Sequence, residues 1–302
     1  MRRTVWRWGR LVGSLLLLAI LVWRLGTGPF LDGIRSVDGR ALAAAAGIAL
    51  LSTVCCAWRW TIVARGLGIR LSLPAAVAAY YRSQFLNVTL PGGIAGDVHR
   101  GVSHGRDVSD LGGALRAVVW ERFAGQVVQT LITVVVLLAL PSPVHSSMPL
   151  VAVTALMVLI GGGLVAKIRD IRAPRLSRRA WLGVTLTSAI VVVGHAVSFL
   201  IAARTAGSAV TPTQMVPIAL LVMMAMVLPS AAGWGPREGV TAWAFGAVGL
   251  GAQQGVSTAV VYGVMVLVAS LPGAAVLIVG WFRRTRFPRH TESPLREQAV
   301  HA

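Results

Sequence analysis

Long runs of apolar residues, separated by short polar connections, dominate the chain from about residue 8 to residue 281. A helix that spans a bilayer needs about 20 predominantly apolar residues. Runs of this kind predict spanning helices at about 8–26, 41–64, 117–140, 149–166, 181–203 and 256–281. Three segments are shorter or interrupted and predict broken or re-entrant helices: about 74–91, 215–230 and 238–251. We therefore expect an all-α polytopic membrane bundle of about 6–8 transmembrane helices.

The composition agrees with this pattern, because 56% of the residues are hydrophobic and only 13% are charged. A soluble domain carries about 25% charged residues. The formal net charge of +18 could suggest a nucleic-acid partner. A nucleic-acid binder gathers its basic residues on one water-facing surface, whereas here they occupy the connections between apolar runs. We therefore expect no nucleic-acid partner.

The distribution of basic residues predicts the orientation of the chain in the membrane. If the N-terminus is cytoplasmic, most of the 28 Lys and Arg residues fall in cytoplasmic loops and tails, as the positive-inside rule requires. We therefore expect both termini to lie in the cytoplasm. The expected location is the plasma membrane, specifically a bacterial inner membrane, which the chain crosses several times. Five further arginines lie within or at the ends of apolar runs: Arg59, Arg82, Arg116, Arg122 and Arg237.

The same orientation constrains the short segments. Segment 74–91 is expected to enter the membrane, break and leave on the same side, and His99 and His104 are assigned to the cytoplasmic loop after it. Segment 215–251 fits either three crossings or a re-entrant pair with one crossing. We expect a single transmembrane domain over residues 1–282, with possible halves 1–140 and 149–282. A disordered basic cytoplasmic tail is expected at 283–302.

Two broken-helix sequences of similar composition begin at Leu90 and at Leu228, 138 residues apart. Irregular backbone at membrane depth is tolerated where protein or a water-filled cavity surrounds it, and transporters often place such breaks in inverted repeats. The alternative is a chance similarity between two turns rich in Gly and Pro. The residues expected to break the helices are Pro91, Gly92, Gly93, Gly96, Pro229, Gly233 and Gly235.

Three carboxylates lie inside or at the edge of apolar runs, namely Asp97, Glu121 and Glu238, and each has an arginine nearby. An ionised side chain at the bilayer centre costs about 2.5–3.5 kcal/mol on insertion scales. Adjacent residues of a helix point about 100° apart, so Glu121 and Arg122 should each find a partner elsewhere. Such residues indicate either a functional site or a structural salt-bridge network.

Polar residues at helical spacing accompany these charged residues, and together they form a candidate site. Between residues 78 and 89 they predict one wall of a polar cavity, or hydrogen bonds that join helices. Because arginines outnumber carboxylates in these regions, an anionic phosphate is the expected ligand. No metal site and no cofactor are expected. The predicted substrate-binding residues are Arg82, Gln84, Asn87, Asp97, Arg100, Glu121, Arg122, Gln126, Arg237 and Glu238.

These elements together resemble the membrane domain of the lysylphosphatidylglycerol synthase/flippase family over roughly residues 10–282. The resemblance rests on their order and spacing: Asn87, Leu90-Pro91-Gly92, Gly96-Asp97, Arg100, Glu121-Arg122 with Gly125, Leu228-Pro229, Gly233, Gly235 and Arg237-Glu238-Gly239. It implies a bundle of about eight helices with re-entrant pieces that moves lipids or lipid-linked molecules between leaflets. Ile94-Ala95 stands where the family pattern leads us to expect a more glycine-rich run.

The leading functional hypothesis is therefore a flippase-like transporter of a lipid or lipid-linked anionic molecule, and a transporter is favoured over an enzyme. Several family members attach a soluble aminoacyl-transferase domain, which is not expected here because only about 20 polar residues follow the last span. One alternative is an integral-membrane transferase that uses Asp97 or Glu121 as a base. Another is a non-catalytic subunit of an envelope-assembly complex. The expected partner is a membrane lipid with an anionic or phosphate-bearing headgroup. A second copy of the chain and a partner enzyme are the open alternatives for a protein partner.

Overall fold

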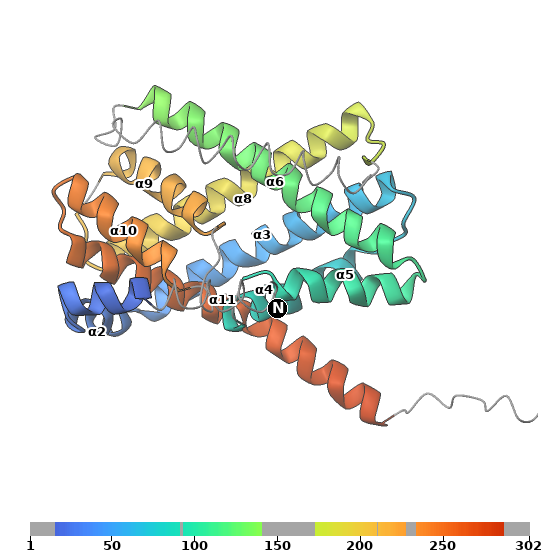
Figure 1. Cartoon of the computed structure of the whole chain (residues 1–302), viewed down its shortest axis with the longest axis horizontal. Coiled ribbons are helices and arrows are strands. Elements are labelled where there is room, and N and C mark those ends of the chain that lie inside the picture. Colours follow the sequence, from blue (N-terminus) through green and yellow to red (C-terminus); the bar gives the residue numbers. More distant parts are fainter. Residues whose placement is uncertain (1–15, 91–92, 141–172, 210, 228–233, 287–302) are drawn as a thin grey trace, which may run out of the picture.

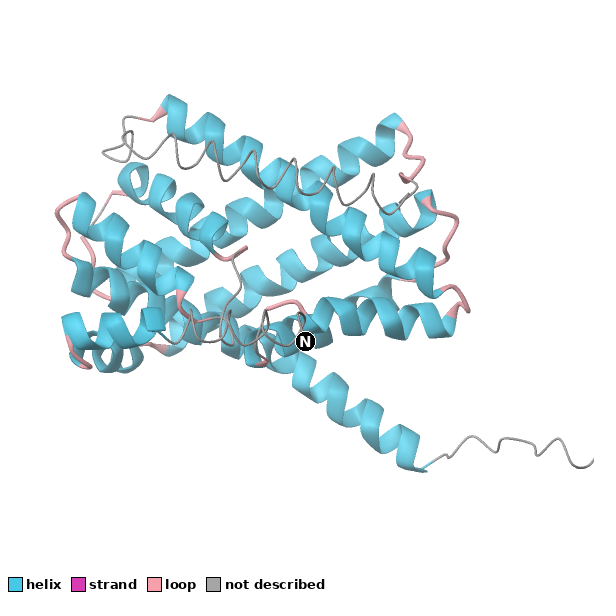
Figure 2. Ribbon diagram, in the orientation of Figure 1, coloured by secondary structure: helices cyan, strands magenta, loops and turns pink. Residues whose placement is uncertain are grey.

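The computed structural model describes residues 16–90, 93–140, 173–209, 211–227 and 234–286, and within these ranges the chain forms helices and no strand (Figure 2). A first helix covers Leu16–Leu25. The labelled helices are α2 (Gly28–Ser36), α3 (Gly39–Gly66), α4 (Leu73–Thr89), α5 (Ala95–Asp107), α6 (Leu111–Ala139), α8 (Arg178–Thr205), α9 (Pro212–Ala225), α10 (Pro236–Ala247) and α11 (Ala252–Arg286). The expected all-α membrane bundle is confirmed.

Four described helices are long and apolar enough to cross a membrane: α3, α6, α8 and the 252–282 part of α11. A fifth span results if Leu16–Leu25 and α2, which are bent by 95°, count as one broken span. The described residues thus hold fewer spans than the 6–8 expected. The predicted span at 149–166 and the first part of the predicted span at 8–26, up to residue 15, lie outside them. Helices α9 and α10, with 14 and 12 residues, reach only about 20 Å at 1.5 Å per residue.

The region after residue 93 differs from the prediction, because α5 is a helix and not a loop. His104, which was assigned to the loop, is buried on α5, and its ring packs edge-on against Trp60 with centroids 5.6 Å apart. Helix α6 begins six residues before the predicted 117, since Asp110 caps it by accepting a hydrogen bond of 2.8 Å from the Gly113 N–H. The search for apolar runs therefore did not find α5 or the first turns of α6, because both segments are polar or rich in glycine.

The two halves of the described chain repeat one order of elements, in which a long helix precedes a helical hairpin and another long helix follows it (Figure 1). The first hairpin comprises α4 and α5 and stands between α3 and α6. The second hairpin comprises α9 and α10 and stands between α8 and α11. In both hairpins the first helix carries a proline in its first turn, which suits a helix start.

The two hairpins open toward opposite ends of the bundle. The open end of the first hairpin lies where α3 ends, because Ile69 contacts Gly113 and Leu111 contacts Gly105. Helix α8 begins at that same end, since the segment before it bonds to Gly66. The second hairpin opens at the other end, where α8 finishes and Gln254 of α11 donates a hydrogen bond of 3.1 Å to the Ser208 hydroxyl.

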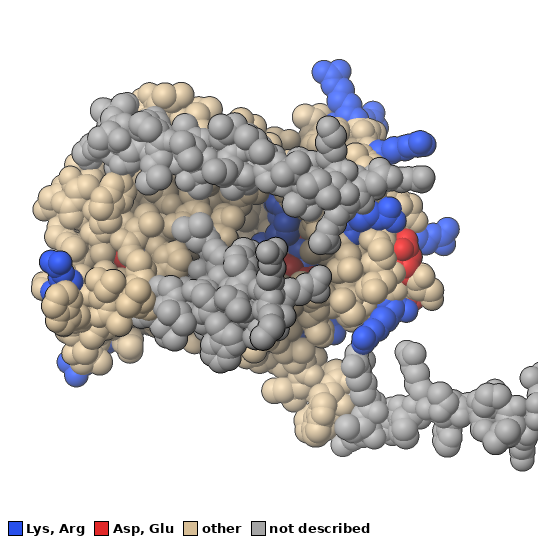
Figure 3. All heavy atoms as spheres, in the orientation of Figure 1, with Lys and Arg blue, Asp and Glu red and all other residues tan. Residues whose placement is uncertain are grey.

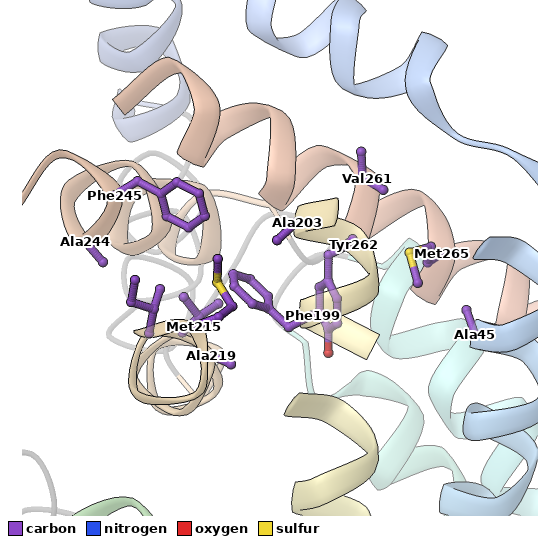
Figure 4. Close-up of a cluster of buried hydrophobic side chains, with 13 residues drawn as sticks. Ala45, Phe199, Ala203, Met215, Ala219, Ala244, Phe245, Val261, Tyr262 and Met265 are labelled. Carbon is purple, nitrogen blue, oxygen red and sulfur yellow. The ribbon is translucent and has the colours of Figure 1, made fainter. Parts of the chain in front are cut away.

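Each half contains most of one buried hydrophobic cluster, although Ala45 of α3 belongs to the cluster of the second half. In the first half, Trp60 of α3, Tyr80 of α4 and small residues of α6 form one buried cluster. In the second half, Phe199, Tyr262 and Phe245 bring α8, α11 and α10 together around α9 (Figure 4). Alanine is the most frequent residue in both clusters, which lets the helix backbones approach closely, as is typical of packing within membranes.

Exposed arginines gather at the end of the bundle where α3 ends, which we call the basic end. Figure 3 shows basic atoms concentrated at the right-hand end of the molecule in this view. The residues that define the basic end are Arg65, Arg70, Arg106, Arg175, Arg178 and Arg179. This distribution matches the loop asymmetry from which the orientation was predicted.

Candidate functional site

Glu121 lies at the centre of a buried charge network in the first half. Its side chain on α6 is fully buried and forms ion pairs with Arg59 of α3 and with Arg100 of α5, the latter at 2.6 Å. The Tyr80 hydroxyl on α4 donates a third hydrogen bond of 2.8 Å. One carboxylate thus joins four helices, and a buried ion pair of this kind is tolerated only when its remaining lone pairs are also satisfied.

Asp97, in the first turn of α5, forms the second centre of the network. Its carboxylate accepts hydrogen bonds from Ser83 and Asn87 of α4, both at 3.1 Å. It also accepts 3.0 Å from Arg100 Nε and 2.6 Å from Arg122 Nη2. An acid at the start of a helix is further favoured by the helix dipole. Asp97 therefore holds the first hairpin together and connects it to α6.

Arg100 links the two carboxylates, since its Nε bonds to Asp97 and its Nη2 to Glu121. Its guanidinium lies between two aromatic rings, 4.6 Å from the Trp60 centroid and 4.2 Å from that of Tyr80. Cation–π contacts of this kind contribute up to about 2 kcal/mol where water is excluded. The side chain has no exposed surface, so Arg100 is a structural member of the network and is not available to a ligand.

The network carries one more positive than negative charge. Three guanidinium groups, those of Arg59, Arg100 and Arg122, face the two carboxylates Asp97 and Glu121. The side chains of Arg59 and Arg100 are 7% and 0% exposed, but that of Arg122 is 50% exposed. The excess charge therefore reaches the surface of the protein at Arg122.

Two glycines make the network possible. A Cβ on Gly125 of α6 would lie 2.8 Å from the Arg59 Nη1 atom, so only glycine leaves room for that guanidinium. Gly96, the residue before Asp97, packs directly on the Ser83 backbone, and its N–H donates a hydrogen bond of 2.7 Å to the Asn87 side chain. Helices α4 and α5 can therefore approach closely enough for Ser83 and Asn87 to reach Asp97.

Replacing Gly96 with alanine should destabilise the first hairpin by about 1–3 kcal/mol, the usual cost of overpacking. The new Cβ would collide with the Ser83 carbonyl, which is backbone and cannot move aside. A lower midpoint of thermal unfolding in detergent would show the effect. Gly47→Ala is the matched control, because a Cβ there meets nothing within 4 Å and alanine favours the helix. Equal midpoints for the two variants would contradict the prediction.

Arg237 and Glu238 form a separate buried pair at the start of α10. Arg237 Nη2 lies 2.5 Å from Glu238 Oε1, and the other carboxylate oxygen accepts 2.7 Å from the Gly235 N–H. The Arg237 guanidinium also lies 5.3 Å from the Trp234 ring centroid. These contacts fix the first turn of α10 after the break. In the described part of the chain, no ion pair joins Arg237 or Glu238 to the first-half network.

The structure thus brings together only some of the predicted site residues. Asn87, Asp97, Arg100, Glu121 and Arg122 form one network, and Glu121 and Arg122 pair with different partners, as expected. Other predicted residues lie elsewhere. Gln84 accepts a hydrogen bond of 3.2 Å from Thr53, Gln126 contacts Met224 of α9, and Arg82 is half-buried on α4.

The glycines predicted to break the helices differ in their backbone conformation. Gly93 and Gly235 have positive φ angles, of 67° and 113°, whereas Gly96 lies within α5.

Four of the predicted break residues lie outside the described residues: Pro91, Gly92, Pro229 and Gly233. Arg59 belongs to the network but was not among the predicted site residues, although it lies within the predicted span 41–64. An arginine in the middle of an apolar helix is itself a strong signal of a buried partner. The Ser188 hydroxyl, which accepts a hydrogen bond of 2.9 Å from Arg59, gave no such signal.

His195 of α8, in the second half, lies with its Nδ1 atom 2.7 Å from the Tyr262 hydroxyl of α11, so a side-chain hydrogen bond joins α8 and α11. Tyr262 also lies beneath the Arg237 guanidinium, 5.9 Å from the ring centroid. The second half therefore contains a smaller polar cluster than the first.

Comparison with known proteins identifies the family of the chain. The family profile described as the lysylphosphatidylglycerol synthase TM region matches residues 7–273. A search of curated proteins finds no match to the chain. The matched region includes both hairpins and every residue of the charge network. With a match over most of its length, this multi-pass membrane chain belongs to the lysylphosphatidylglycerol synthase membrane-region family.

Proposed function

We propose that the protein moves a lipid with an anionic, phosphate-bearing headgroup between the leaflets of the cell membrane. The observation that carries this proposal is the excess positive charge of the buried network, which reaches the protein surface at Arg122. A planar guanidinium suits a phosphate, because it can donate two parallel hydrogen bonds. Among the described members of the network, Arg122 is the guanidinium that a headgroup can reach.

The depth of Arg122 supports this reading. It lies eleven residues after the start of α6, about 16 Å along the helix at 1.5 Å per residue. Counted from the start of the predicted apolar run at residue 117, Arg122 lies about 8 Å into the span, inside a hydrocarbon core of about 30 Å. A cation held inside the core would lower the free energy of a headgroup where the bilayer alone raises it.

The two hairpins offer a path across the membrane for the lipid headgroup. In the proposed orientation, with cytoplasmic termini and the basic end in the cytoplasm, the first hairpin is re-entrant from the cytoplasm and the second from the outside. Transporters often place substrate sites where the breaks of such opposed elements face each other. The headgroup would pass along the hairpins while the acyl chains remain in the lipid.

Reconstitution in liposomes tests the proposal. The probe lipids carry the fluorophore on an acyl chain, so that their headgroups are natural, and a membrane-impermeant quencher reports their exchange between leaflets. We expect the protein to accelerate the exchange of phosphatidylglycerol about tenfold more than that of phosphatidylcholine. Both lipids offer a phosphodiester to Arg122, but the choline ammonium of phosphatidylcholine is repelled by the excess positive charge of the network. Exchange no faster than in protein-free vesicles would contradict the proposal.

A further inference from the structure

Three hydrogen-bond donors on α6 converge on one sulfur atom of the second hairpin. The Nε2 atoms of Gln126 and Gln129 lie 3.6 and 3.8 Å from the Met224 Sδ atom, and the Thr130 Oγ1 atom lies 3.9 Å from it. Thr130 and Met224 are buried, while the two glutamines are partly exposed. This cluster is where α6 of the first half meets α9 of the second.

Three strong hydrogen-bond donors here share one weak acceptor. A thioether sulfur is a weak acceptor, and strong donors at membrane depth ordinarily find oxygen acceptors. Thr133, one turn further along α6, shows the ordinary solution, since its hydroxyl donates 2.8 Å to the Gln129 carbonyl. In the described part of the chain, the acceptor that faces both glutamine amides is Met224 alone. An oxygen-bearing ligand would satisfy these amides better than the sulfur does.

The cluster lies beside the exposed cation. Gln126 and Gln129 follow Arg122 at i+4 and i+7 and therefore share its face of the helix. At 1.5 Å per residue they lie about 6 and 10 Å further along α6. A headgroup whose phosphate is bound to Arg122 would extend its polar substituent over this distance. A primary amide can both donate to a hydroxyl and accept from it, so hydroxyl groups match these side chains.

We infer that Gln126 and Gln129 form a headgroup subsite next to Arg122 that recognises uncharged hydroxyl groups, and that a bound headgroup would displace Met224 from these two amides. The inference rests on the proposed function and adds a substrate class, which is an anionic phospholipid with a hydroxylated headgroup. Because Met224 belongs to the second hairpin and the glutamines belong to the first half, a bound headgroup would contact both halves. Methionine is suited to this role, since its flexible side chain moves aside easily.

The test compares two lipids that carry the same phosphodiester charge, phosphatidylglycerol and phosphatidylpropanol, which differ only in the headgroup hydroxyls. Wild-type protein in liposomes should exchange phosphatidylglycerol about tenfold faster, the effect of one or two hydrogen bonds. The double variant Gln126→Leu/Gln129→Leu should lose this preference by slowing phosphatidylglycerol alone. Thr133→Val is the matched control, because its hydroxyl is already bonded to the backbone, and it should retain the preference.

The outcomes separate the inference from the function on which it rests. If the wild type exchanges both lipids at one rate, or if the double variant slows both equally, the hydroxyl subsite is wrong while lipid transport stands. If the wild type exchanges neither lipid, the proposed function fails and the subsite fails with it. A preference that the double variant abolishes and Thr133→Val keeps would support the subsite.

Discussion

Replacing Glu121 with leucine should lower the free energy of unfolding by about 3–5 kcal/mol, the cost of removing one partner of a buried ion pair. Arg59 and Arg100 would then remain buried with their guanidinium groups uncompensated, and the Tyr80 hydroxyl would lose its acceptor. The side chains of all three are almost fully buried, so water cannot replace the carboxylate. We expect the variant to be recovered in low yield and to unfold at a much lower temperature.

Thermal unfolding in detergent, followed by the loss of the monodisperse species, measures this effect. Glu121→Gln should lose less stability, because the amide oxygen still accepts hydrogen bonds although the charge is gone. Asp107→Asn is the control for removal of an acid, since Asp107 is exposed at the end of α5. If the midpoint of Glu121→Leu equalled that of Asp107→Asn, the proposed role of Glu121 at the centre of the network would be wrong.

The apolar pattern predicted the long helices well, because a membrane fixes both the length and the composition of a span. Helices α3 and α8 extend only two or three residues beyond the predicted 41–64 and 181–203. Helix α5 could not be found in this way. Its sequence is polar and contains three glycines, and its side chains become acceptable at this depth only because α4 and α6 supply their partners. That information is tertiary and has no local pattern.

The candidate site was predicted only in part, because the partner of a buried charge also depends on tertiary structure and has no local sequence pattern. Helix geometry showed that Glu121 and Arg122 must pair with other residues, and the structure confirms separate partners. It could not show that Glu121 pairs with Arg59, 62 positions away in the sequence. Nor could it show that the adjacent residues Arg237 and Glu238 pair with each other, since this depends on Glu238 folding back onto Gly235 after the break. The charges were therefore found, but their division into two clusters was not.

The last prediction concerns Arg122, where removal of the side chain should impair transport far more than stability. Asp97 would lose its 2.6 Å contact with Arg122 but would keep Ser83, Asn87 and Arg100 as partners. Because Asp97 keeps one guanidinium and two neutral donors, removing Arg122 leaves no buried charge without a partner, and the loss of folding free energy should be small. A charge-assisted hydrogen bond to a phosphate, in contrast, contributes about 1.5–3 kcal/mol.

Arg122→Ala should therefore slow the exchange of phosphatidylglycerol between leaflets by about ten- to a hundredfold, with the lipid present as a trace probe. Its midpoint of thermal unfolding should stay close to that of the wild type. Arg122→Lys should be intermediate, because an ammonium keeps the charge but loses the planar, two-pronged geometry. Arg106→Ala removes an exposed arginine of the basic end and should leave exchange unchanged. If Arg122→Ala folded normally and transported as fast as Arg106→Ala, the excess charge of the network would have no part in headgroup binding, and the site would have to be sought elsewhere in the molecule.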